Sequence, residues 1–134
     1  MEKPPLTIAL LDDDPSVLKA MGRLLRSAGW AVVAFEDPLA FLDHMAKHQL
    51  PVAVIDLCMP VMNGLEVQAR LQKLSPATQV VFLTSHDDPS AREKAFAAGA
   101  FAFLSKPADG AELLSVINSA AAQNGQGANR RSPA

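Results

Sequence analysis

Short apolar runs alternate with amphipathic segments along the whole chain. The runs are rich in Val, Ile, Leu and Phe and lack the polar alternation of a strand with one wet face. They therefore predict five strands of a parallel sheet that is buried on both sides. These runs are Thr7–Leu11, Ala31–Phe35, Val52–Ile55, Val80–Leu83 and Ala102–Leu104.

Helix signals lie between the apolar runs. Asp14, Asp37 and Asp88 each precede a proline, which pairs an N-cap carboxylate with a residue suited to the first helical position. Asn63 begins a further amphipathic segment, and another one closes the domain. Strand and helix thus alternate five times. Because crossovers between parallel strands are right-handed, this predicts a doubly wound α/β sheet with helices on both faces.

The length of 134 residues fits one domain, which we place at residues 1–122. Residues 124–129 are rich in Asn, Gly and Gln. We therefore expect residues 123–134 to form a flexible tail or a truncated linker.

Charge and composition exclude several kinds of partner. With 12 Lys and Arg against 14 Asp and Glu, the net charge of −2 gives no basic face, so we expect no direct nucleic-acid binding by this chain. The apolar runs fall far short of the ~20 residues of a membrane span. Cys58, the single cysteine, has no partner for an intrachain disulfide, and the first residues carry no apolar signal-peptide core. We expect a cytoplasmic protein that does not contact membranes.

Chemically active residues follow the predicted strands. Asp12, Asp13 and Asp14 follow the first strand, Asp56 the third, Thr84 the fourth and Lys106 the fifth. Sites in open α/β sheets lie beyond the carboxyl ends of the strands, so these side chains are expected to meet at one edge.

The acidic cluster is typical of a Mg²⁺ site. Mg²⁺ prefers hard oxygen ligands, and a sphere begun by Asp13 and Asp56, with Asp12 nearby, stays open to a phosphoryl group. Lys106 and Thr84 would stabilise that group, and an aspartate carboxylate can itself be the nucleophile. Asp14 is already explained as an N-cap. His86 either borders the site or is a solvated loop residue.

The ordered motifs resemble the receiver domains of two-component response regulators, the CheY-like family, over about residues 5 to 122. Each motif is weak alone, but all of them occur in order at strand ends. The motifs are Leu10-Leu11-Asp12-Asp13-Asp14, Asp56-Leu57-Cys58-Met59-Pro60, Asn63-Gly64, Leu83-Thr84-Ser85, Gly99-Ala100 and Ser105-Lys106-Pro107.

The resemblance implies a sheet with strand order 2-1-3-4-5. It also implies that Asp56 accepts a phosphoryl group from a phosphohistidine on a sensor histidine kinase or phosphotransfer protein. Asp12, Asp13, Asp56 and the backbone carbonyl of Cys58 would then be the ligands of Mg²⁺.

The resemblance further implies that Thr84 and Lys106 contact the acyl phosphate and that Phe103 is an aromatic switch residue. The Lys106–Pro107 bond is cis in such domains. Two positions depart from the family pattern: Ala108 replaces a common phenylalanine, and Phe103 lacks the hydroxyl of a common tyrosine. The expected output surface comprises the fourth helix, fifth strand and fifth helix, at about residues 90 to 121, where a target or a second copy forming a homodimer would bind.

Three other functions compete with a phosphorylated receiver. A nucleotide-binding enzyme is disfavoured because no Gly-x-Gly-x-x-Gly or Gly-Lys-Ser/Thr follows the first strand. An aspartyl-phosphate phosphatase typically carries its nucleophile after the first strand, so we expect no turnover enzyme. A pseudo-receiver that acts only as an interaction module is disfavoured by the intact acidic set. The chain is otherwise either a single-domain regulator or the amino-terminal receiver of a longer DNA-binding transcriptional regulator.

Overall fold

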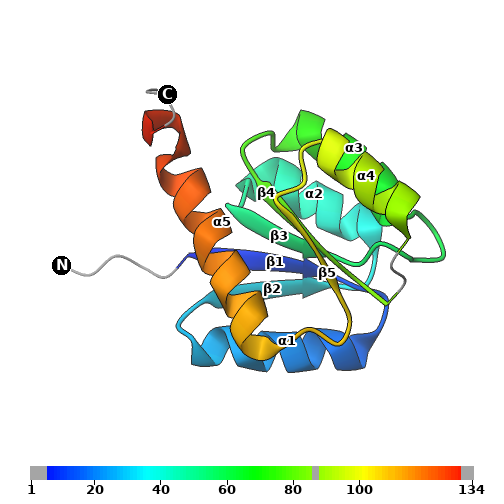
Figure 1. The fold of residues 1–134 in the computed structure, drawn as a ribbon, viewed down its shortest axis with the longest axis horizontal. Helices are drawn as coiled ribbons and strands as arrows, with labels where there is room; N and C mark the ends of the chain where they lie inside the picture. The colour runs from blue at the N-terminus through cyan, green and yellow to red at the C-terminus, as the bar shows by residue number, and fades with distance from the viewer. Residues whose placement is uncertain (1–5, 86–87, 131–134) are drawn as a thin grey trace.

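The computed structural model describes residues 6–85 and 88–130, in which five strands alternate with five helices (Figure 1). All strands are parallel in one sheet with the order β2-β1-β3-β4-β5. The predicted α/β architecture and the strand order implied by the resemblance are both confirmed. The elements are β1 Thr7–Leu11, α1 Pro15–Ser27, β2 Ala31–Phe35, α2 Pro38–His48, β3 Val52–Ile55, α3 Gly64–Leu74, β4 Gln79–Thr84, α4 Pro89–Ala97, β5 Ala102–Ser105 and α5 Gly110–Arg130.

The helices begin where the sequence places their caps. The carboxylates of Asp14, Asp37 and Asp88 accept backbone N–H groups in the first turns of α1, α2 and α4, with a proline following each cap. Asn63 and Glu66 form a reciprocal capping box at the start of α3, with N–O distances of 3.0 Å in both directions. Each cap satisfies N–H groups that have no partner inside the helix.

Helices cover both faces of the sheet, which explains the missing polar alternation. In β1, Ala9 and Leu11 pack with α2, α3 and α4, whereas Ile8 and Leu10 pack on the other face with α1 and α5. The prediction that all five strands are fully buried is wrong for the edges. Most residues of β2 and β5 are only partly buried, because each of these strands has one neighbour.

Helix α5 runs to Arg130, so its backbone continues beyond position 123, where the tail is expected to begin. The division of the chain at that position stays a prediction. Within the described residues, no helix combines the length and hydrophobicity needed to cross a bilayer.

Ala108, which departs from the family pattern, lines an apolar pocket between α1 and α5. The pocket has a volume of about 480 Å³, and Met21, Leu24 and Leu113 also line it. The small side chain at position 108 therefore leaves space beside the start of α5.

Candidate functional site

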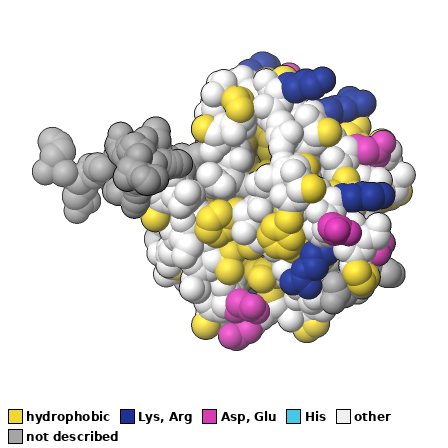
Figure 2. Space-filling model, turned by 45° about the horizontal axis from the view of Figure 1, so that its top comes forward, with side chains coloured by type: hydrophobic (Ala, Val, Ile, Leu, Met, Phe, Trp, Pro, Cys, Tyr) yellow, Lys and Arg dark blue, Asp and Glu magenta, His cyan; other side chains and the backbone are white. Residues whose placement is uncertain are grey.

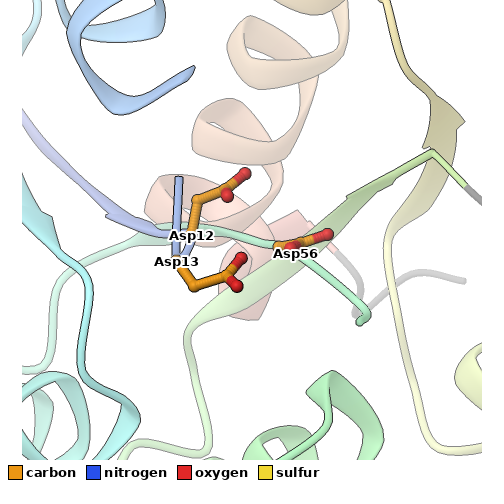
Figure 3. A group of neighbouring side chains, drawn as sticks. All are labelled: Asp12, Asp13 and Asp56. Carbon is orange, nitrogen blue, oxygen red and sulfur yellow. The ribbon is translucent and has the colours of Figure 1, made fainter. Parts of the chain in front are cut away.

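Three carboxylates from two neighbouring strands form one cluster. Asp12 and Asp13 directly follow β1 and Asp56 directly follows β3, so parallel pairing of these strands brings them together (Figure 3). One oxygen from each carboxylate lies within 4.8 Å of the others. Asp12 and Asp56 are buried, whereas Asp13 is exposed. The structure thus unites the acidic residues that the sequence placed at separate strand ends.

Lys106 provides the positive charge of the cluster. Its Nζ donates to Asp12 Oδ2 at 2.8 Å and lies 3.6 Å from Asp56 Oδ1. The backbone N–H of Lys106 donates to the carbonyl of Thr84 at 2.7 Å, which fixes the start of the β5–α5 loop beside the end of β4. The following peptide bond to Pro107 is cis, as the resemblance implies. The ammonium therefore contacts both buried carboxylates from a loop of defined conformation.

Asp56 has an unusual ionisation equilibrium. Burial, and then the nearby charge of Asp12, raise the pKa of Asp56 from its ordinary value of 3.8 to about 6. Lys106 and the backbone N–H of Cys58 oppose this rise only in part. Asp56 is therefore mainly ionised at pH 7, yet the cluster carries more negative charge than Lys106 neutralises.

Asp14 contributes to the fold near this cluster. Its Oδ1 accepts from the backbone N–H of Ser16 at 2.9 Å and from the Ser16 hydroxyl at 2.7 Å. These bonds, the hydroxyl first, hold the pKa of Asp14 below its ordinary value. The backbone N–H of Asp14 also donates to Asp12 Oδ1 at 2.9 Å, which orients that carboxylate. The N-cap interpretation of Asp14 is confirmed.

Thr84 and Phe103 lie on the adjacent strands β4 and β5. Thr84 is fully buried, and Phe103 is 4% exposed. The Phe103 ring lies 6.0 Å from that of Phe82 and 6.5 Å from that of Phe96, and the Arg92 guanidinium stands 5.4 Å from its centroid. Phe103 thus connects the core to α4. His86, considered as a residue bordering the site, lies outside the described residues.

The sequence alone assigns no role to Gly64, although this residue belongs to the Asn63-Gly64 motif. A Cβ built on Gly64 would lie 2.8 Å from the carbonyl oxygen of Asp56 and 2.9 Å from both Leu57 Cα and a Phe82 ring carbon. The Gly64 N–H also donates to the Leu57 carbonyl at 2.7 Å. The available signal was a glycine in the first turn of a helix, where its low helix propensity calls for another reason.

The residues of the cluster fit a divalent cation that prefers oxygen. Three carboxylates, with one oxygen from each within 4.8 Å of the others, match the ligand preference of Mg²⁺. After burial, repulsion by Asp12 is the next cause of the raised pKa of Asp56. A bound cation would relieve that repulsion. The backbone carbonyl of Cys58, the remaining ligand expected from the resemblance, follows Asp56 by two residues in the same loop.

Comparisons with known proteins agree with this geometry. The family model described as "Response regulator receiver domain" matches residues 8–118. The response regulator protein TodT of Pseudomonas putida is 37% identical over 113 residues, which are 84% of this chain and 50% of TodT. The transcriptional regulatory protein GlrR of Escherichia coli is 33% identical over 131 residues, which are 98% of this chain and 30% of GlrR. The chain thus spans half or less of the length of these two relatives.

Solved structures show the same fold. A response regulator receiver domain protein from Clostridium thermocellum superposes with a TM-score of 0.84 at 27% identity, covering 88% of this chain and 95% of that one. A DrrB receiver domain described as BeF3-activated has a TM-score of 0.79 at 28% identity, covering 87% and 97%. Family match, fold and the order of strand-end residues lead to one conclusion: the chain belongs to the response regulator receiver domain family.

Proposed function

We propose that this chain is a phosphorylation-dependent signalling switch in which Asp56 accepts a phosphoryl group from a phosphohistidine on a sensor histidine kinase or phosphotransfer protein. The observation that carries the proposal is the Asp56 carboxylate itself. It lies at a strand end, 3.6 Å from the Lys106 ammonium and beside two further carboxylates. Although burial and the charge of Asp12 raise its pKa to about 6, the carboxylate is still mainly ionised, and therefore nucleophilic, at pH 7.

The transfer exchanges one bond for another. A carboxylate oxygen of Asp56 attacks phosphorus, the bond from phosphorus to the donor imidazole nitrogen breaks, and that nitrogen leaves with the electron pair. The product is an acyl phosphate on Asp56. Lys106, 3.6 Å from Asp56 Oδ1, stabilises the negative charge on the phosphoryl oxygens. Thr84, at the end of β4, would offer its hydroxyl to the same oxygens after a local rearrangement, because it is fully buried here.

Asp12, Asp13, Asp56 and the Cys58 carbonyl would hold Mg²⁺. When bound, Mg²⁺ supplies positive charge to the carboxylates and to phosphoryl oxygens alike. Asp12 is already oriented by the Asp14 N–H and by Lys106, so one acidic ligand is positioned in advance.

The proposed output is a change on the face formed by α4, β5 and α5. Figure 2 shows apolar side chains gathered on this face with charged ones around them, and Phe96 of α4 is 44% exposed. A phosphoryl group adds about −1.5 to −2 charges at the strand ends and attracts Thr84 and Lys106. Movement of Thr84 vacates space into which Phe103 rotates, which alters the surface offered to a target or to a second copy.

Incubation with excess acetyl phosphate and Mg²⁺ tests the proposal. A receiver accumulates about one phosphoryl group per chain and consumes further acetyl phosphate only as slowly as its acyl phosphate hydrolyses, whereas a phosphatase consumes the donor rapidly and accumulates little label. We expect stoichiometric labelling. Rapid turnover without accumulated label would assign the chain to the enzyme class, and neither labelling nor turnover would favour the pseudo-receiver.

The metal ligands are tested by calorimetric titration with Mg²⁺. Asp13→Asn and Asp12→Asn should each weaken binding about tenfold or more, because each removes one of few protein ligands. Asp43→Asn is the matched control, since Asp43 pairs with Lys47 on the exposed face of α2. Unchanged affinity in both site variants would place the metal elsewhere.

A second candidate is the amino-terminal receiver of a longer DNA-binding regulator. The printed names of relatives favour it: GlrR is a transcriptional regulatory protein and NtrC a DNA-binding transcriptional regulator, and the chain covers 30% and 24% of them. DNA would then be bound by another segment, because this chain has a net charge of −2. In both versions the chain works in the cytoplasm, where ATP charges the kinase. The length of the complete reading frame discriminates between them.

A further inference from the structure

Two glutamines of α3 connect this helix to the last turn of α4. Gln68 Nε2 donates to the carbonyl of Ala95 at 3.1 Å, and Gln72 Nε2 donates to the carbonyl of Ala98. The donors are four residues apart, so they lie on one face of α3. The acceptors are carbonyls near the end of α4. That of Ala95 also accepts the backbone N–H of Ala100 at 2.9 Å, so Gln68 adds a second bond to it. Side chains of α3 therefore hydrogen-bond to the carboxyl end of α4.

Burial of the Gln68 side chain lowers the stability of the fold. Gln68 is 1% exposed, and its Oε1 has no hydrogen-bond partner among the described residues. A buried acceptor without a partner lowers stability, and an apolar side chain of similar length would avoid this loss. The contribution of glutamine at this position is thus its N–H bond to α4.

Helix α4 buries little apolar surface against α3. Its buried residues are Ala91 and Ala95, which bury far less apolar area than the Val67 and Leu71 side chains of α3. Its large apolar residue, Phe96, is 44% exposed. The hydrogen bonds from Gln68 and Gln72 therefore contribute much of the interaction between α4 and α3.

The surroundings allow these bonds to open. Gln68, Gln72 and Gly99 line a polar pocket of about 220 Å³, together with Ser75 and Thr78. The amides can leave the carbonyls toward this pocket, where water can satisfy them, and no large apolar side chain has to be repacked.

We propose that Gln68 and Gln72 form a latch that holds α4 against α3 in the unphosphorylated protein and sets how readily α4 moves on phosphorylation. The claim about movement on phosphorylation rests on the proposed function, whereas the claim that the glutamines hold α4 against α3 does not. Because α3 begins at the loop that follows Asp56, the latch would link the acidic site to α4 through a single helix.

Amide hydrogen exchange on the full chain tests the latch. Gln68→Met and Gln72→Met remove the donors but keep side-chain length. Exchange of the α4 amides at residues 93–98 should accelerate about fivefold for each bond lost, while the amides of α1 keep their rates. Gln79→Met is the control, because it changes the same pocket without altering either amide. Gln72 is exposed, so its variant carries the test if Gln68→Met does not fold.

Beryllofluoride with Mg²⁺ tests the regulatory half. In the unaltered chain it should accelerate α4 exchange, and in the double variant this further acceleration should be smaller because the latch is already open. Unchanged α4 exchange in the free double variant would overturn the latch. An equal response in both chains would show that the latch does not set the switch. An unaltered chain that fails to bind beryllofluoride would contradict the proposed function but leave the first arm valid.

Discussion

Ionisation of Asp56, which the proposed phosphoryl transfer requires, lowers the stability of the folded chain. The Asp56 pKa of about 6 lies above the ordinary 3.8, so the folded chain binds this proton more tightly than the unfolded chain does. The free energy of unfolding therefore falls as pH rises from about 4 to about 6 and stays lowered above that range. At neutral pH the nucleophile is thus ionised in a buried, acidic site, and its ionisation lowers the stability of the fold.

Asp56→Asn should consequently stabilise the protein at pH 7. We expect a gain of about 1–2 kcal/mol, allowing for screening by water, which disappears as the pH falls below 4. Urea denaturation at pH 7 and pH 3.5 measures it, with Asp43→Asn as the control on an exposed pair. A variant that is less stable at pH 7 would show that burial and the charge of Asp12 do not destabilise ionised Asp56.

The sequence predicts the strand-end residues best, because neighbouring parallel strands end at the same edge of the sheet. Asp12, Asp13 and Asp56 are therefore expected together without knowledge of any side-chain conformation, and they lie together. The sequence does not distinguish the buried Asp12 from the exposed Asp13, since this depends on which side of the β1 end faces Lys106. Nor does it reveal the bond from Gln68 to Ala95, which joins two helices through tertiary packing.

Among the elements, the start of α3 is fitted most tightly to the site. A methyl group at position 64 would meet the Asp56 carbonyl oxygen and Leu57 Cα, which are backbone atoms and yield little. Gly64→Ala should therefore destabilise the protein by about 1–3 kcal/mol and slow phosphorylation of Asp56 by displacing its backbone.

Gly110→Ala is the matched control for the start of a helix. A Cβ there lies 3.5 and 3.6 Å from the methyl groups of Leu24, which is ordinary contact. Denaturation and acetyl phosphate labelling should both be near those of the unaltered chain for this control. Equal behaviour of the two alanine variants would refute the role assigned to Gly64.

The start of α5 is by contrast underfilled. Ala108→Leu should place apolar surface in the pocket between α1 and α5 and raise the free energy of unfolding by about 1 kcal/mol. Thermal denaturation measures the effect. A lower melting temperature would mean that the space at Ala108 does not accept a larger side chain.

At the scale of the whole molecule, we expect phosphorylation at the carboxylate cluster to change the face formed by α4, β5 and α5. Amide NMR spectra recorded with and without beryllofluoride should show shifts around Asp12, Asp56 and Lys106, and further shifts in residues 90–121, because Phe103 packs against α4. Shifts confined to the residues around Asp12, Asp56 and Lys106 would show that the chain binds beryllofluoride but does not change the face of α4, β5 and α5.

Peptide mass spectrometry of the chain after reaction with acetyl phosphate and Mg²⁺ locates the phosphoryl group directly. We expect one phosphoryl group, on Asp56, and none on Asp56→Asn under the same conditions. Full labelling of Asp56→Asn, or a label located on Asp12 or Asp13 in the unaltered chain, would contradict the proposal that Asp56 is the phosphoacceptor.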